Sequence, residues 1–201
     1  MSMEALQERI GYRFPDKALL ERALIQSSYA NESRQKIECN ERRDYRGDAV
    51  LSIIVPDQSY HKFHLAEGDL TRIRASLVCE KSLFEFAQKI QLGLELLLGH
   101  GEEQTGGRER PSVVSDAFEA LIAGIYLDGG LEAAQRFVLP FVEEDLTHAA
   151  APFVDYKTRL QEIAQQNPEE RLSYVVESES GPDHDKHIVV AVRFNSDRVA
   201  R

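Results

Sequence analysis

Acidic side chains recur at helical spacing in two separate segments of this sequence. Glu41, Asp44 and Asp48 are three and four residues apart, so on a helix they would share one face. Asp116 and Glu119 are also three residues apart. If the two helices pack together at these residues, their carboxylates supply the oxygen ligands that hard divalent cations prefer. Such a site would hold Mg²⁺ ions that activate water for attack on a phosphodiester and stabilise the leaving oxygen.

The same spacing also fits ordinary solvated helix faces. Acidic residues number 34 among 201, so about five pairs at a spacing of four arise by chance. The net charge of −10 by itself argues against the positive surface of a nucleic-acid binder. Bound cations would reverse that sign locally. Spacing and composition therefore leave a metal site and a solvated surface both open.

Helical periodicity places the first acidic segment in a helical region. Apolar residues recur at helical spacing over residues 3–29, with a break before Asp16, which is a plausible N-cap. Residues 41–55 are predicted to form a helix that kinks or ends at Pro56, because proline has no amide hydrogen to donate. Residues 70–87 are predicted to form one further helix.

The second acidic segment follows a stretch rich in glycine and charge. Residues 99–111 are predicted to be an exposed loop. The helix predicted over 112–128 carries its apolar stripe roughly opposite the two acids, and Gly129-Gly130 can end it. Residues 131–149 are again helical in pattern, so residues 1–150 are predicted to be an all-helical domain.

The pattern changes after Ala149-Ala150-Ala151-Pro152, a plausible linker. A helix over 156–166 is predicted to precede two strands, at 172–178 and 187–194, joined by a turn at 181–184. A helix and one hairpin are too little for an independent sheet domain. Residues 151–201 are therefore expected to form an incomplete α+β unit.

Other sequence features exclude several classes of protein. Cys39 and Cys79 form no CxxC motif and lie in no histidine cluster, so neither a zinc site nor a disulfide framework is indicated. No apolar run approaches the length that spans a bilayer, and residues 1–11 lack the features of a signal peptide. A cytoplasmic protein without a membrane partner is expected.

Three segments resemble the signature blocks of bacterial ribonuclease III. Residues 40–51, NERRDYRGDAVL, resemble the usual NERLEFLGDAVL of that family. Residues 67–78, EGDLTRIRASLV, are similar to its EGELTRLRASLV segment. Residues 106–130, GGRERPSVVSDAFEALIAGIYLDGG, resemble the third block. The blocks stand in the family's order within the first 150 residues.

The resemblance implies an all-α endonuclease domain over residues 1–150, paired as a homodimer that cuts double-stranded RNA. It implies 5′ phosphates, short 3′ overhangs and structured substrates such as rRNA precursors. The implied cofactor is Mg²⁺, with Mn²⁺ as a substitute. The family's motif assigns metal binding to Asp44, Asp48, Asp116 and Glu119, catalysis to Asp48 and Glu119, and further cleft positions to Glu41 and Glu67.

The last 50 residues resemble part of a double-stranded RNA-binding domain. Residues 155–162 are similar to its first helix, and residues 181–184, GPDH, to the loop between its strands. Gln161 and His184 stand at positions that reach the RNA minor groove in that family. Its third strand and closing helix are not expected within the sequence, so residues 151–201 are interpreted as an incomplete domain.

Departures from the family pattern within the first block bear on the activity of the site. Arg43 and Arg46 stand where the family has apolar residues, and Asp44 stands where it has glutamate. The aspartate is shorter by about one carbon–carbon bond. Two arginines at core-facing positions would cost several kcal/mol if buried without partners. An active endonuclease and a catalytically impaired homologue that binds duplex RNA or regulates both remain open, whereas an unrelated helical scaffold requires three accidental matches.

Overall fold

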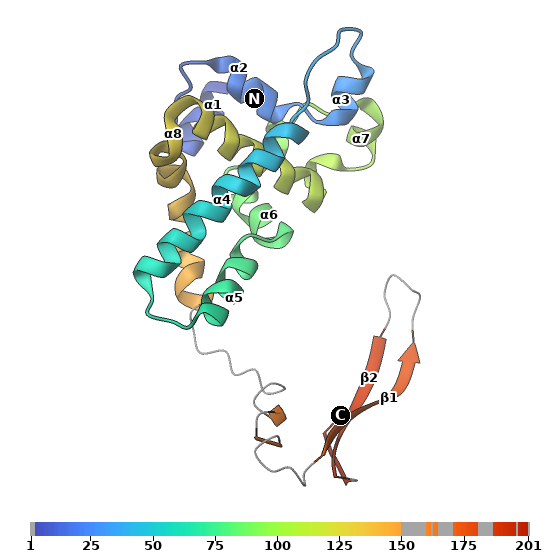
Figure 1. Ribbon diagram of the computed structural model, residues 1–201. Coiled ribbons are helices and arrows are strands. Elements are labelled where there is room, and N and C mark those ends of the chain that lie inside the picture. Colours follow the sequence, from blue (N-terminus) through green and yellow to red (C-terminus); the bar gives the residue numbers. More distant parts are fainter. Residues whose placement is uncertain are drawn as a thin grey trace. The chain divides into compact units, whose positions relative to one another are not determined.

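The computed structural model describes residues 3–149, 160–161, 163–164, 171–180, 187–195 and 197–200. The chain divides into two compact units, residues 1–151 and residues 152–201. The first unit is built from helices, and the described part of the second contains an antiparallel sheet (Figure 1). The predicted fold class, a helical domain followed by an α+β unit, is confirmed.

The helices of the first unit surround one hydrophobic core. An isolated parallel β-bridge pairs Ile25 with Leu97 within this helical unit. The helical elements are α1 (Met3–Ile10), α2 (Lys17–Leu24), α3 (Ser27–Glu32), α4 (Glu41–Lys62), α5 (Glu67–Leu77), α6 (Glu80–Lys89), η1 (Leu92–Glu95), α7 (His100–Gln104), η2 (Gly107–Glu109) and α8 (Pro111–Ala149).

Helix α4 continues through Pro56, so of the two predicted outcomes, a kink or an end, the end is wrong. Proline removes one amide donor, but buried side chains on both sides of it keep the same face of the helix against the core. Val55 and Ser59, for example, are fully buried. Ser59 Oγ also donates to the Val55 carbonyl at 2.7 Å. Packing of one long face outweighs the missing backbone bond.

The single helix predicted over 70–87 is also wrong, because α5 and α6 are separate. The backbone of Cys79 is extended, with φ −120° and ψ 156°. Ser82 Oγ donates to the Ser76 carbonyl at 2.7 Å, which satisfies a backbone group at the end of α5. The apolar repeat continues across this break, so periodicity alone does not reveal it.

The segment predicted as a loop over 99–111 contains α7 and η2, which corrects that expectation in part. Arg108 organises it. Its Nη1 donates to the carbonyls of Gly93, Leu94 and Leu96 at 3.0, 3.0 and 2.9 Å. Its Nε donates to Glu103 Oε1 at 2.6 Å. One guanidinium thus satisfies the carbonyls of η1 and ties them to the segment before α8.

Helix α8 begins at Pro111, where the missing amide hydrogen costs nothing. The predicted break at Gly129-Gly130 is present, since Gly130 has φ 75° and interrupts the helical backbone. Asp16 caps α2 as predicted, accepting a hydrogen bond from the Ala18 amide at 3.0 Å.

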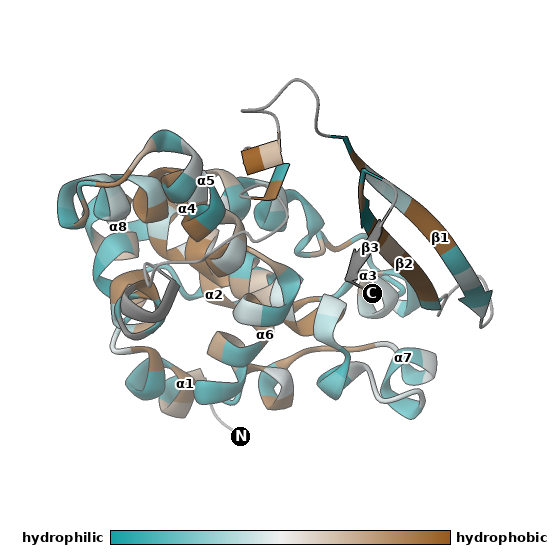
Figure 2. Cartoon of the chain, turned by 90° about the horizontal axis from the view of Figure 1, so that it is seen from below, coloured by the Kyte–Doolittle hydropathy of each residue, from teal (hydrophilic) through white to brown (hydrophobic). Residues whose placement is uncertain are grey.

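In the first unit, hydrophobic positions lie mostly on the sides of the helices that face one another, and hydrophilic positions lie mostly on the outer sides (Figure 2). Four aromatic rings, three from α8 and one from α6, pack against one another in the core. Phe118 lies 5.5 Å from Phe137, 5.6 Å from Phe141 and 6.2 Å from Phe86, measured between ring centroids. No helix in the described residues is long and apolar enough to cross a membrane.

The second unit contains strands β1 (Leu172–Ser180), β2 (His187–Phe194) and β3 (Asp197–Ala200), in that order across an antiparallel sheet. The two predicted strands are confirmed, and β1 runs two residues further than expected. The expected lack of a third strand is wrong, because β3 pairs with β2. Residues 160–161 and 163–164 are helical. The turn predicted at 181–184 lies outside the described residues.

Candidate metal centre

Helix α4 delivers Asp44 to the site from its first turn. The Asn40 amide donates to the Ile25 carbonyl at 2.8 Å, which fixes the entry of α4 against the end of α2. The Asn40 carbonyl then accepts from the Asp44 amide at 2.9 Å. Val50 and Leu51 are buried about two turns further along the helix. These contacts set the rotation of α4, so Asp44 lies on the side that faces α8.

Helix α8 delivers Asp116 and Glu119. Between them lie Ala117 and Phe118, which are fully buried in the core. Because residues three apart share a face of a helix, anchoring Phe118 inward leaves both acids on the opposite side. The packing of the aromatic cluster therefore orients the two carboxylates.

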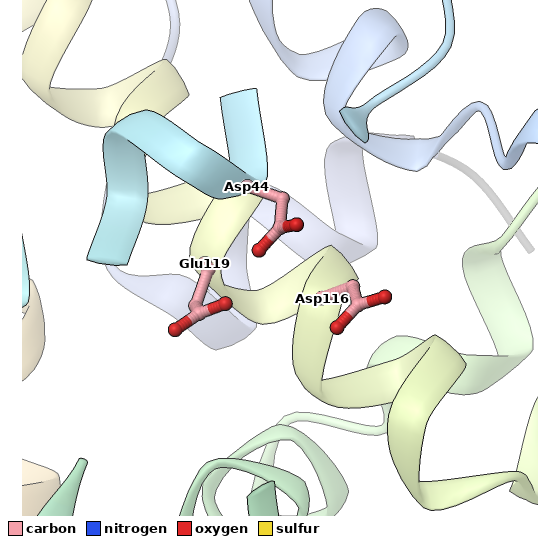
Figure 3. Close-up of side chains that lie close together, drawn as sticks. All are labelled: Asp44, Asp116 and Glu119. Carbon is pink, nitrogen blue, oxygen red and sulfur yellow. The ribbon is translucent and has the colours of Figure 1, made fainter. Parts of the chain in front are cut away.

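The three carboxylates converge although they come from two helices far apart in sequence. One carboxylate oxygen from each of Asp44, Asp116 and Glu119 lies within 4.8 Å of the others. Figure 3 shows Asp44 on α4 beside Asp116 and Glu119 on α8. Asp44 and Glu119 are half-buried, and Asp116 is exposed. Solvent can therefore reach the cluster from one side.

Crowding of negative charge makes this cluster costly to ionise. Burial raises the pKa of Glu119 to about 9, with further contributions from a hydrogen bond to Asp44 and from the charges of Asp44, Asp48 and Asp116. Burial also raises the pKa of Asp116 to about 6, followed by the charges of Asp44, Glu80 and Glu41. A cation among these groups would favour their ionised forms.

The donor set fits a hard divalent cation. Carboxylate oxygens on rigid helices are the ligands that Mg²⁺ and Ca²⁺ take, and Mg²⁺ commonly keeps several waters beside one or two carboxylates. Asp44, Asp116 and Glu119 would hold such an ion, with water filling the remaining positions on the exposed side.

The other predicted acids lie at different distances from this cluster. Asp48 is exposed and outside the group of three, yet its charge acts on Glu119. Glu41 is exposed and acts on Asp116. Glu67 is the first residue of α5 and follows the C-terminal end of α4. At the rise of an α-helix, that end of α4 lies about 25 Å along the helix axis from Asp44. Within one chain, Glu67 is therefore remote from the cluster.

The two predicted RNA-contacting residues belong to the second unit. Gln161 is helical and half-buried. His184 lies outside the described residues.

Sequence reasoning missed two neighbours of the cluster. A glycine inside a helix is unfavourable unless packing requires it, and this signal marks Gly47, whose Cα faces the backbone of Glu119. Glu80, at the start of α6, adds charge near Asp116. No spacing rule relates residue 80 to residue 116, so this proximity comes from tertiary structure alone.

The two arginines that depart from the family pattern do not lie in the core, so the cost of burying them without partners does not arise. Arg46 is exposed. Arg43 is half-buried, and its Nη1 donates to the Leu19 carbonyl at 3.3 Å. Both guanidinium groups keep polar surroundings, because the side chain of arginine is long enough to leave the apolar interior.

Comparisons with known proteins extend this picture to nearly the whole chain. Residues 16–146 match the family described as Ribonuclease-III-like, and residues 156–201 match the double-stranded RNA binding motif. A protein named Ribonuclease 3 from Caldanaerobacter subterraneus subsp. tengcongensis is 44% identical over 94% of this chain and 84% of its own length. Another with that name, from Oceanobacillus iheyensis, is 43% identical over 96% of this chain and 86% of its own length.

A solved structure supports the same assignment. The nuclease domain of ribonuclease III from Campylobacter jejuni, described for structural flexibility in a region involved in dimer formation, is 42% identical. It covers 71% of this chain and 97% of its own length, with a TM-score of 0.66. The chain belongs to the ribonuclease III family of endoribonucleases, and a double-stranded RNA binding motif follows its nuclease region.

Proposed function

We propose that this protein hydrolyses phosphodiesters of double-stranded RNA in a Mg²⁺-dependent reaction that leaves 5′ phosphates and short 3′ overhangs. Its substrates would be structured precursors such as rRNA, processed in the cytoplasm. The convergence of Asp44, Asp116 and Glu119 within 4.8 Å carries this proposal. These residues stand at the motif positions of a nuclease family, and a double-stranded RNA binding motif follows them.

The residues of the cluster have complementary tasks in this scheme. Bound divalent cations supply positive charge that lowers the pKa of water and stabilises the charge on the departing oxygen. Asp44, Asp116 and Glu119 fix the position of that charge against the scissile phosphate. Asp48 and Glu41 would hold and orient water on the exposed side. The negative field that disfavours RNA in the metal-free protein is thereby neutralised where cleavage occurs.

Glu119→Gln tests the assignment because the amide keeps the size of the side chain and removes its charge. Cleavage of a perfect RNA duplex should fall by at least about two orders of magnitude at saturating Mg²⁺, while duplex binding persists. A binding measurement in Ca²⁺ separates the two effects. Unchanged cleavage by the variant would refute the metal-site assignment.

We also propose that the nuclease region, residues 1–150, works as a homodimer. Large apolar side chains lie exposed along α4, where a solvent-facing surface is ordinarily polar. The exposed fractions are 82% for Tyr45, 54% for Ile53 and 69% for Tyr60. Their spacing places them on one side of the helix. Such a stripe is typical of a protein interface, and two copies would provide one cut on each RNA strand.

Sedimentation tests the dimer. The wild-type protein should sediment at twice the mass of the chain, and Ile53→Glu should shift it toward the monomer, because an unpaired charge would enter the interface. Lys62→Glu, at the end of the same helix, controls for the change of charge. A monomeric wild type at micromolar concentration, with or without RNA, would count against this arrangement.

A catalytically impaired protein that binds duplex RNA or regulates is the second candidate, favoured by Asp44 in place of the family's glutamate. The shorter side chain reaches less far toward a cation. Asp44→Glu restores the length and should raise the cleavage rate if reach is limiting. If the wild-type protein binds duplex RNA but cleaves it at no Mg²⁺ concentration, the result favours the catalytically impaired protein.

We further propose that residues 151–201 bind double-stranded RNA. Gln161 and His184 would contact the minor groove through 2′-hydroxyls and base edges, as the motif implies. Gln161→Ala should weaken duplex binding without changing the cleavage rate at saturating RNA. An unchanged dissociation constant in a direct binding measurement would remove Gln161 from the RNA contact.

A further inference from the structure

Helices α4 and α8 come into backbone contact at Gly47, beside the carboxylate cluster. A Cβ atom built at Gly47 would overlap the carbonyl oxygen and carbon of Glu119 and lie 2.9 Å from its Cα. Nonbonded carbon atoms are at their optimum roughly 3.5 to 4.0 Å apart. The obstacle is backbone on both sides, so no side-chain rotation relieves it. Any residue larger than glycine has to push the two helices apart by about an ångström or more.

This contact lies between the helices that carry the candidate ligands. Asp44 is one turn before Gly47 and Asp48 follows it, both on α4. The backbone that Gly47 touches belongs to Glu119 itself. Separating the helices here would therefore widen the gap between Asp44 and the pair Asp116 and Glu119.

The distance between the carboxylates of α4 and α8 determines which size of cation they can hold. Mg²⁺ demands near-ideal octahedral geometry with oxygen about 2.0 to 2.1 Å away, whereas Ca²⁺ accepts irregular shells at about 2.3 to 2.6 Å. An increase of about an ångström in ligand separation exceeds what Mg²⁺ tolerates and is better matched by a larger ion.

We propose that Gly47 is a positioning residue that selects the smaller divalent cation, because its lack of a side chain lets α4 and α8 close around the cluster. This inference rests on the proposed function of the cluster as a metal site. It adds that the ion preference is set by the closeness of two backbones as well as by the carboxylates themselves.

The test compares Gly47→Ala with the wild type by direct cation binding. Mn²⁺ serves as a reporter, its free concentration read from its electron paramagnetic resonance signal, and Mg²⁺ or Ca²⁺ displaces it. Binding that survives in Glu119→Gln is subtracted, because it belongs to other acids. Gly47→Ala should weaken Mg²⁺ binding at least about tenfold and Ca²⁺ binding several-fold less.

Gly124→Ala is the matched control. Gly124 also lies inside a helix, on α8, so alanine brings the same gain in helix propensity. The nearest atom to its added Cβ is the Leu19 carbonyl oxygen at 3.4 Å, an ordinary contact. This variant should bind both cations as the wild type does.

The outcomes separate the two proposals. If the wild type and Glu119→Gln bind Mn²⁺ identically, the metal site itself is wrong. If the wild type binds through the cluster and Gly47→Ala keeps the same ratio of Mg²⁺ to Ca²⁺ affinity, only the role of Gly47 is refuted. Should Gly47→Ala unfold, refolding is titrated with each cation. Ca²⁺ should then restore helical circular dichroism at lower concentration than Mg²⁺, and equal or absent rescue contradicts the proposal.

Discussion

Glu119→Gln is expected to stabilise the metal-free protein even though it removes the proposed activity. Burial and neighbouring acids raise the pKa of Glu119 from 4.5 to about 9. The folded state therefore binds this proton more tightly than the unfolded state does. Stability contributed by the protonated form is present below pH 4.5 and is lost progressively as the pH rises toward 9.

The magnitude follows from that shift. At pH 7.5, three pH units above the unfolded pKa, the unfolded state has ionised while the folded state keeps the proton, and this lowers stability by about 4 kcal/mol before screening by water is considered. Glu119 is only half-buried, so screening by water reduces this to about 1 to 2 kcal/mol. Glutamine never ionises, and the variant should be more stable than the wild type by that amount in EDTA.

Urea unfolding in EDTA, repeated with Mg²⁺, measures this effect. The advantage of the variant should shrink or reverse when Mg²⁺ binds the folded wild type. Glu132→Gln, on the same helix with a side chain 83% exposed, should change stability by less than about 0.5 kcal/mol in either medium. The reasoning fails if Glu119→Gln is less stable than the wild type in EDTA at pH 7.5, or if the difference is the same at pH 5.

Three further substitutions test the elements that hold the site. Phe118→Ala should cost about 3 to 5 kcal/mol of unfolding free energy, because the ring is fully buried among three others, and chemical denaturation would show a smaller loss if the packing were loose. Arg108→Ala should leave three carbonyls without their donor and speed amide hydrogen exchange in residues 92–110, with unchanged exchange contradicting its bracing role. Pro56→Ala should raise stability by about 1 to 3 kcal/mol by restoring a helical hydrogen bond, and a lower melting temperature would show that the proline is favourable.

Local pattern and motif were enough to predict most helices and all three members of the carboxylate cluster. The spacing of Asp116 and Glu119 places them opposite the buried Phe118, and this follows from helical geometry alone. What spacing cannot supply is the distance between helices. Asp48 matches the family motif and Asp44 departs from it, yet Asp44 and not Asp48 belongs to the group of three.

The failed predictions fall where specific contacts override the pattern of apolar and helix-breaking residues. Pro56 is tolerated because both turns beside it are anchored in the core. The break at Cys79 depends on a serine hydroxyl that bonds to a backbone carbonyl. Strand β3 has only four residues, too few for an alternating pattern to predict it, and it is held by pairing with β2. Arg43 and Arg46 stand where family residues are apolar, yet Arg43 is half-buried and Arg46 is exposed, because exposure depends on how α4 is rotated.

Cleavage of an end-labelled perfect RNA duplex by the wild-type protein, titrated with Mg²⁺, tests the central claim most directly. The carboxylate cluster predicts cuts on both strands that require Mg²⁺, leave 5′ phosphates and stop when EDTA is added. An RNA that is bound but remains intact at every Mg²⁺ concentration, or one that is cut equally well in EDTA, would contradict a metal-dependent nuclease built on Asp44, Asp116 and Glu119.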